Sequence, residues 1–214
     1  MVVLHYTGMR TGAEALVRLC DPASKVSAHY VVEEEGTVHA LVPEDKRAWH
    51  AGVSYWAGER DINSRSIGIE IVNGGHEFGY MLFPDAQIRA VIALCQEIVA
   101  RHAIVPARVL GHSDVAPARK VDPGHLFPWK TLAEHGVGVW PESHEALLPP
   151  LPLKGEDLER FYRALTAYGY DPQVQQADVI VAFHRHFCPE RFTRWDDRPA
   201  VPDQTSVQRL SAMC

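Results

Sequence analysis

The chain has 214 residues, of which 46% are hydrophobic and 22% are charged, and its formal net charge at pH 7 is −6. This composition is typical of a globular protein and excludes a disordered, collagen-like or low-complexity chain. No apolar run approaches the roughly 20 residues of a membrane-spanning helix. The acidic balance, without any cluster of Lys and Arg, also argues against nucleic acid as a partner.

The cysteines and the first residues of the chain give information on the cellular compartment of the protein. Cys20, Cys95, Cys188 and Cys214 are widely spread and form no Cys-x-x-Cys pair, which favours free thiols over a disulfide framework or a cysteine metal site. No signal-peptide pattern follows Met1, so a cytoplasmic location is expected, with a periplasmic one as the alternative for a trimmed chain. A monomer is expected.

Several short strands are predicted in the first half of the chain. Apolar, β-branched runs at residues 2–6, 27–32 and 108–110 are bounded by Gly, Pro and Asp, which favours strands. Residues 37–42 follow a Glu-Gly turn and are expected to form a hairpin with the strand before them. Because these strands are interspersed with helical sequence, we predict an α/β fold with helices on the faces of a sheet.

Two further segments have the clearest periodicity. Residues 67–72 alternate strictly, so that three isoleucines point to one face of a strand and Glu70 to the other. Residues 84–102 change to a 3.6-residue period with one apolar stripe, which predicts an amphipathic helix with Pro84 in its first turn.

The composition changes near residue 141. A proline-rich stretch at 147–152 is typical of a linker, and helical spacing follows at 156–168 and 174–187, with a third short helix expected at 203–213. Three such helices make a small domain with a marginal core. The predicted division is a main domain at 1–145, a linker at 146–155 and a helical domain at 156–214.

Two histidines and an aspartate are candidate ligands of a metal ion. His5 lies on the first predicted strand, His112 follows the strand at 108–110, and Asp122 comes shortly after in a loop. Imidazole and carboxylate suit Zn²⁺, and three protein ligands leave a fourth tetrahedral position for water, as in catalytic zinc sites. The spacing is equally compatible with three unrelated polar residues, because side chains so far apart in the chain meet only through the fold.

Other residues could take part in chemistry beside such a metal. Glu70 must face a cleft, a partner or solvent; beside a metal-bound water it would act as a general base, and the alternative is a solvated strand face. Lys120 is either a donor to a developing oxyanion or an ordinary solvated lysine. Trp49 and the pair Tyr55-Trp56 lie in a loop between strands, where they either bind sugar rings or fill the core.

Short motifs occur in order along residues 2–140. They are His5-Tyr6-Thr7, Val26–Tyr30, Trp49–Gly52, Asn63–Glu70, Gly111–Pro117, Lys120 and Asp122–Gly124. Together they resemble the zinc-dependent N-acetylmuramoyl-L-alanine amidases of the type 2 family, which are related to the peptidoglycan recognition proteins. Several ordered motifs make a far more specific signal than any one of them.

The resemblance implies a central mixed β-sheet flanked by helices, with one Zn²⁺ ion at the end of a groove. His5, His112 and Asp122 match the family's metal ligands, Glu70 its catalytic glutamate and Lys120 its lysine. Some relatives have cysteine at the third ligand position, so the aspartate places this chain in the amidase branch.

The sequence also departs from part of the family. Ala28 stands where phage members have a catalytic tyrosine, which makes Glu70 more necessary as the base. The resemblance leads us to expect substrate contacts from four motif residues, His29, Trp49, His50 and Asn63.

The activity implied is hydrolysis of the amide bond between N-acetylmuramic acid, possibly in its 1,6-anhydro form, and the L-alanine of the stem peptide. The substrate would be peptidoglycan or muropeptides, in cell-wall turnover and recycling. Residues 1–145 would then be the zinc amidase domain, and 156–214 resemble the helical peptidoglycan-binding module of some members. The alternative is a non-catalytic peptidoglycan recognition protein that keeps the groove and lacks the zinc.

Overall fold

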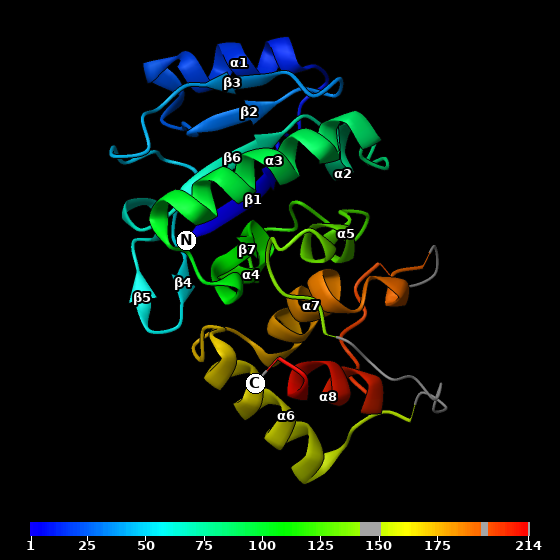
Figure 1. The fold of residues 1–214 in the computed structure, drawn as a ribbon. Coiled ribbons are helices and arrows are strands. Elements are labelled where there is room, and N and C mark those ends of the chain that lie inside the picture. Colours follow the sequence, from blue (N-terminus) through cyan, green and yellow to red (C-terminus); the bar gives the residue numbers. More distant parts are fainter. Residues whose placement is uncertain (142–150, 194–196, 214) are drawn as a thin grey trace.

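The protein is built around one sheet whose strands come from distant parts of the chain (Figure 1). The computed structural model describes residues 1–141, 151–193 and 197–213. The strands of the sheet are β1 (Val2–Tyr6), β2 (Tyr30–Val32), β3 (Val38–Ala40), β6 (Ile67–Ile71) and β7 (Val109–Gly111). Their order is β3-β2-β6-β1-β7, with β3 antiparallel to β2 and the other neighbours parallel. The predicted mixed sheet is therefore confirmed.

One face of the sheet packs against the long helix α3 (Asp85–His102), whose predicted position is confirmed to within one residue. The apolar stripe of α3 meets alternate side chains of the strands, as the two-residue period of a strand requires. The sheet residues in this core are Val2, Leu4, Ile67, Ile69, Ile71 and Val109. The predicted common face of the three isoleucines is thus confirmed.

The other face of the sheet is covered in part by the C-terminal helices. These are α6 (Gly155–Tyr168), α7 (Gln176–Phe187) and α8 (Gln204–Ser211), each within two residues of its predicted bounds. They bury Phe161, Phe183 and Phe187 in the same apolar cluster as Val3 and Leu110 of the sheet. The helical region therefore shares its core with the sheet.

A small hairpin joins the sheet region to the helical region. It consists of β4 (Tyr55–Trp56) and β5 (Glu59–Arg60). The Trp56 ring packs edge-on against the Tyr170 ring, 5.0 Å between centroids, and the backbone N–H of Ala57 donates to the carbonyl of Gly169 at 2.8 Å. A Cβ at Gly169 would lie 2.6 Å from the Trp56 ring, so only glycine allows this approach. Trp56 thus fills the core, whereas Trp49 is half exposed.

Other helices were not predicted from the sequence. They are α1 (Gly12–Cys20), α2 (Gly75–Phe78), α4 (His112–Val115) and α5 (Trp129–Glu134). The strand predicted at 27–32 is shorter than expected, because the backbone N–H of Ser27 donates to Trp49 instead of to a neighbouring strand.

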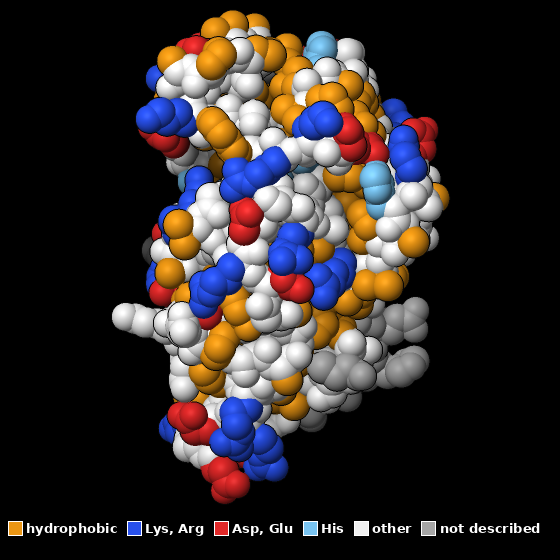
Figure 2. Space-filling view, turned by 90° about the vertical axis from the view of Figure 1, so that its left-hand side faces the viewer, with side chains coloured by type: hydrophobic (Ala, Val, Ile, Leu, Met, Phe, Trp, Pro, Cys, Tyr) orange, Lys and Arg blue, Asp and Glu red, His pale blue; other side chains and the backbone are white. Residues whose placement is uncertain are grey.

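The cysteines, the predicted linker and the surface of the protein can also be compared with the sequence analysis. Cys20, Cys95 and Cys188 are free thiols, and Cys214 lies outside the described residues. Residues 146–150 of the predicted linker also lie outside them, and the division into domains stays a prediction. Within the described part of the chain, no helix combines the length and apolarity needed to cross a bilayer. On the face drawn in Figure 2, basic and acidic side chains are interspersed.

Candidate active site

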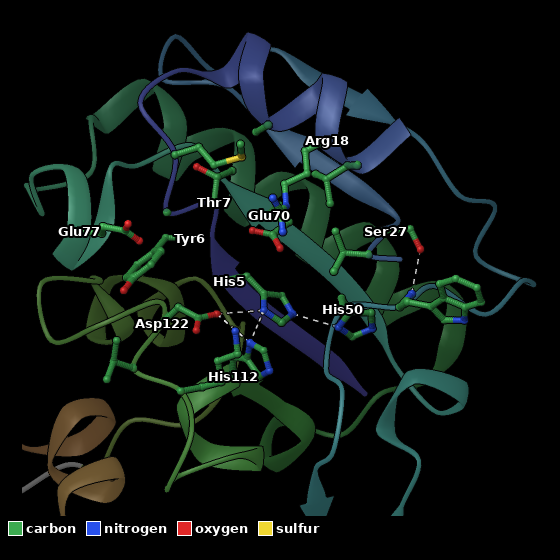
Figure 3. A pocket seen from close by; sticks show the side chains of 18 of the residues that line it. His5, Tyr6, Thr7, Arg18, Ser27, His50, Glu70, Glu77, His112 and Asp122 are labelled. Atoms are coloured by element: carbon green, nitrogen blue, oxygen red, sulfur yellow. Dashed lines mark hydrogen bonds and ion pairs between the residues drawn. The ribbon is translucent and has the colours of Figure 1, made fainter. Parts of the chain in front are cut away.

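The candidate site lies where parallel strands of the sheet end. His5 is near the carboxyl end of β1, Glu70 lies opposite it in register on β6, and His112 directly follows β7. In open α/β sheets, ligands bind outside these carboxyl ends. A pocket of about 640 Å³ is found here, lined by these three residues together with Asp122, Lys120 and others (Figure 3).

Three predicted ligand atoms converge at the floor of this pocket. The Nδ1 atom of His5 lies 2.9 Å from Nδ1 of His112 and 3.0 Å from Oδ2 of Asp122. The distance from His112 Nδ1 to the same oxygen is 3.0 Å. All three side chains are buried, and Figure 3 shows them pointing toward one another. Among the residues that the structure describes, this is the cluster of donors able to hold a metal ion.

Hydrogen bonds on the far side of His5 fix which of its nitrogens carries a proton. The hydroxyl of Ser66 donates to the carbonyl of Ile62 at 2.6 Å, so toward Nε2 of His50, at 3.2 Å, it acts as acceptor. A neutral His50 protonated at Nε2 then accepts at Nδ1 from Nε2 of His5, at 3.0 Å. This leaves a lone pair on Nδ1 of His5, aimed at His112 and Asp122.

The ring of His112 is oriented in the same way. Its Nε2 lies 3.0 Å from the carbonyl oxygen of Ala51, which can only accept, so this nitrogen carries the proton. Arg119 donates to the same carbonyl at 2.7 Å and holds it in place. Two lone pairs and a carboxylate oxygen therefore face one another, as a site for a cation requires, with the outer nitrogens hydrogen-bonded as in protein metal sites.

The protonation states also suit a cation. Burial, together with the neighbouring His112, lowers the pKa of His5 to about 4, so its ring is neutral at pH 7. For Asp122, burial acts to raise the pKa, but the imidazole rings of His112 and His5 beside its carboxylate hold it below its usual value. A neutral imidazole and an ionised carboxylate are the forms that bind metals.

Glu70 lies beside this cluster. Its Oε2 atom is shielded from solvent and forms no hydrogen bond with any residue that the structure describes. Burial, and then the negative charge of Asp122, raise the pKa of Glu70 well above its usual value, while Lys120 acts against them. A carboxyl group with a raised pKa, facing a pocket, is suited to accept and return a proton.

The four residues predicted to contact substrate lie in different surroundings. Trp49 is half exposed and lines the pocket. His29 is fully buried; its Nδ1 accepts from the backbone N–H of Gly68 at 2.9 Å, and its Nε2 donates to the carbonyl of Lys46 at 3.0 Å. No ring nitrogen of His29 is therefore left for a ligand.

The other two are His50, which lines the pocket, and Asn63, which lines a smaller neighbouring pocket. The side-chain oxygen of Asn63 accepts from the backbone N–H groups of His50 and Ala51, at 3.0 and 2.7 Å. The His50 ring orients His5 and lies against β6, where a Cβ at Gly68 would come within 2.3 Å of it. Their contact with substrate stays a prediction, whereas their part in shaping the site is visible.

Sequence reasoning missed the outer partners of the two candidate histidine ligands. Ala51 and Ser66 lie inside the motifs and Arg119 lies outside them, but the sequence indicates none of their hydrogen bonds, because only the fold creates them. Lys120 is half-buried and lines the same pocket, and its backbone N–H donates to the carbonyl of Ala116 at 3.0 Å.

Comparison with known proteins agrees with this geometry. Residues 1–125 match the family described as N-acetylmuramoyl-L-alanine amidase. The chain is 39% identical over 209 residues to the N-acetylmuramoyl-L-alanine amidase AmiD of Escherichia coli K12, covering 88% of this chain and 75% of that protein. It is 38% identical over 123 residues to the 1,6-anhydro-N-acetylmuramyl-L-alanine amidase AmpD of Citrobacter freundii. This match covers 58% of this chain and 62% of that protein.

Solved structures extend the likeness to the helical region. E. coli AmiD, in complex with anhydro-N-acetylmuramic acid-L-Ala-D-γ-Glu-L-Lys, has a TM-score of 0.87 at 35% identity and covers 99% of this chain and 87% of that one. AmpDh3 of Pseudomonas aeruginosa has a TM-score of 0.82 at 33% identity, with 99% and 89% covered. The resemblance found in the motifs is thereby confirmed: the chain belongs to the N-acetylmuramoyl-L-alanine amidase family.

Proposed function

We propose that the protein uses one zinc ion to hydrolyse the amide bond between N-acetylmuramic acid and the L-alanine of the stem peptide. The observation that carries the proposal is the convergence of two imidazole lone pairs and one carboxylate oxygen beside Glu70, whose Oε2 atom has no hydrogen bond to a described residue. The substrate in the AmiD complex and the compound bound to AmpDh3 are both anhydromuramic peptides, which supports the same substrate class here.

His5 and His112, through Nδ1, and Asp122, through Oδ2, would hold the zinc ion. This donor set fits zinc, and three protein ligands leave one tetrahedral position for water or substrate. When bound, the ion would polarise the scissile carbonyl and lower the pKa of a bound water to about 7.

Glu70 would move the proton in both halves of the reaction. Its carboxylate accepts a proton from the attacking water as the new carbon–oxygen bond forms at the scissile carbonyl. The same carboxyl group then returns this proton to the alanine nitrogen as the carbon–nitrogen bond breaks. Lys120, from the same pocket wall, donates a hydrogen bond to the oxygen that becomes negative in between.

Glu70→Gln tests the assignment, with Glu77→Gln as a matched control because both carboxylates line the pocket. Each protein is loaded with one equivalent of zinc and incubated separately with purified sacculi and with anhydro-muropeptides. Mass spectrometry then identifies the fragments. We expect free stem peptides that begin with L-alanine from the wild type and Glu77→Gln, and a rate about 10²–10⁴ lower from Glu70→Gln with zinc retained.

The same experiment separates the alternatives. Near-normal turnover by Glu70→Gln would show that another group is the base. Zinc-loaded wild type that binds both substrates and cuts neither would be a non-catalytic recognition protein. Faster cutting of free muropeptides than of sacculi would favour recycling in the cytoplasm, whereas the reverse would favour turnover of the polymeric wall.

A further inference from the structure

Helix α7 carries two buried histidines with different partners. His184 bonds within the helical region, to the carbonyl of Pro199 at 2.7 Å and the hydroxyl of Ser206 at 2.9 Å. His186 instead reaches into the sheet region, where its Nδ1 lies 2.7 Å from Oδ2 of Asp114. Its ring also stacks on Trp129, 3.7 Å between centroids. One histidine therefore holds the helical region together, and the other attaches it to α4.

Asp114 is fully buried and accepts hydrogen bonds from three donors. The backbone N–H of Gly111 and the ring of His186 bind its Oδ2, at 2.8 and 2.7 Å, and the hydroxyl of Tyr170 donates to its Oδ1 at 2.8 Å. A buried carboxylate is tolerated only when it is hydrogen-bonded in this way. Tyr170 and His186 lie outside residues 1–125, the part of the chain that matches the family.

The segment that Asp114 holds also carries the metal ligands. His112 is the first residue of α4, and Asp114 caps that helix through Gly111 at its start. Between them, the backbone N–H of Ser113 donates to the carbonyl of Asp122 at 2.9 Å. A shift of the first turn of α4 would thus move His112 and Asp122 together.

We propose that Asp114, Tyr170 and His186 are positioning residues through which the helical region sets the geometry of the metal site. The inference rests on the proposed zinc site. Helix α7 and the segment that joins it to α6 would then be part of the machinery that holds the ion, in addition to any contact the helical region makes with peptidoglycan. Outer partners of metal ligands typically account for 10–100-fold in metal affinity.

Tyr170→Phe is the test variant, because it removes one hydroxyl and keeps the ring in the core. Tyr162→Phe is its matched control, since the Tyr162 hydroxyl donates to the backbone carbonyls of Pro172 and Val174, within the helical region. His186→Phe and His184→Phe form a second matched pair on one helix. The zinc dissociation constant is measured by competition with a chromophoric chelator, and the visible absorption spectrum of the Co²⁺-loaded protein reports the ligand geometry. Thermal unfolding of the metal-free proteins measures stability separately.

We expect Tyr170→Phe and His186→Phe to weaken zinc binding about tenfold and to change the Co²⁺ spectrum, with both controls matching the wild type. Equal zinc affinities and spectra for test and control variants, beside a wild type that binds zinc one to one, would overturn the inference and leave the proposed function intact. A wild type that fails to bind zinc would overturn both. Should Tyr170→Phe not fold, the histidine pair decides the question alone.

Discussion

The two faces of the central sheet are built differently. The face under α3 is apolar along its whole length, and its residues belong to one core. The other face is apolar at Val3 and Leu110, under the helical region, and becomes polar at His5 and Glu70, where the strands end in the pocket. A sheet face that only packs against a helix is specified by the local alternation of apolar and polar residues. The structure of a face that also holds a functional site depends on side chains from distant parts of the chain.

The largest effect is expected on the polar face. His5→Ala removes one of the three converging ligand atoms, so we expect zinc binding to be lost. Amidase activity should fall about a thousandfold, which corresponds to about 4 kcal/mol of transition-state stabilisation. Metal analysis and rates on an anhydro-muropeptide measure both. Retention of one equivalent of zinc and of normal turnover would show that His5 is not a ligand.

The neighbouring position on the same strand tests the apolar face. Leu4 is fully buried against α3. Leu4→Ala should lower the free energy of unfolding by about 2–5 kcal/mol, through lost apolar burial and the cavity left behind. Urea denaturation measures this change. Because the side chain points away from the pocket, zinc stoichiometry should stay at one; loss of zinc binding in the folded variant would contradict the separation of the two faces.

The stability of the C-terminal helical region, which covers the face of the sheet opposite α3, should fall at acid pH. Burial lowers the pKa of His184 to about 4, whereas an unfolded histidine has a pKa of about 6.5. Between these values the unfolded chain binds more protons, so stability is lost as the pH falls from about 6.5 toward 4, by up to about 3 kcal/mol. Denaturation across this range should show a smaller loss for His184→Gln than for the wild type. Parallel curves would mean that His184 is not held neutral.

The smallest effect is expected at the rim of the pocket. Trp49 is half exposed, so Trp49→Ala should leave stability nearly unchanged. Loss of an aromatic contact with substrate is worth about 0.5–1.5 kcal/mol, a rise in KM of roughly three- to tenfold. Steady-state kinetics measure the change. Val53→Ala, another exposed position that does not line the pocket, is the control; equal KM values for the two variants would remove Trp49 from the substrate site.

Much of the fold was predictable from short-range patterns. The alternation at β6 and the stripe of α3 are local, and both elements formed where the periodicity predicts. Helix α1 also carried a signal, since Thr11 caps it by accepting from the backbone N–H of Glu14 at 3.2 Å. With only nine residues, the helix is too short for its 3.6-residue periodicity to be recognised in the sequence. The short helix α4 could not be predicted, because its start is held by Asp114, whose partners come from distant α7 and from the segment between α6 and α7.

The candidate site, too, was predictable only in part. His5, His112 and Asp122 were predicted to be metal ligands because ordered motifs resemble a family, whereas their spacing alone left the question open. The roles of His29 and His50 depend on which groups face each ring nitrogen. Residue type does not reveal that, since a histidine suits a ligand, a substrate contact or an internal hydrogen bond equally well.

The place of β1 between two strands that come later in the chain has a consequence for biosynthesis. Val2 pairs on one side with Ile67 and on the other with Val109. During translation, β1 therefore leaves the ribosome long before β6 and β7 have been synthesised. Until then its backbone has no strand to pair with and its apolar side chains are exposed. Such long-range pairing is slow to form and exposed to aggregation, so we expect the yield of active enzyme to depend on chaperones that shield this first segment.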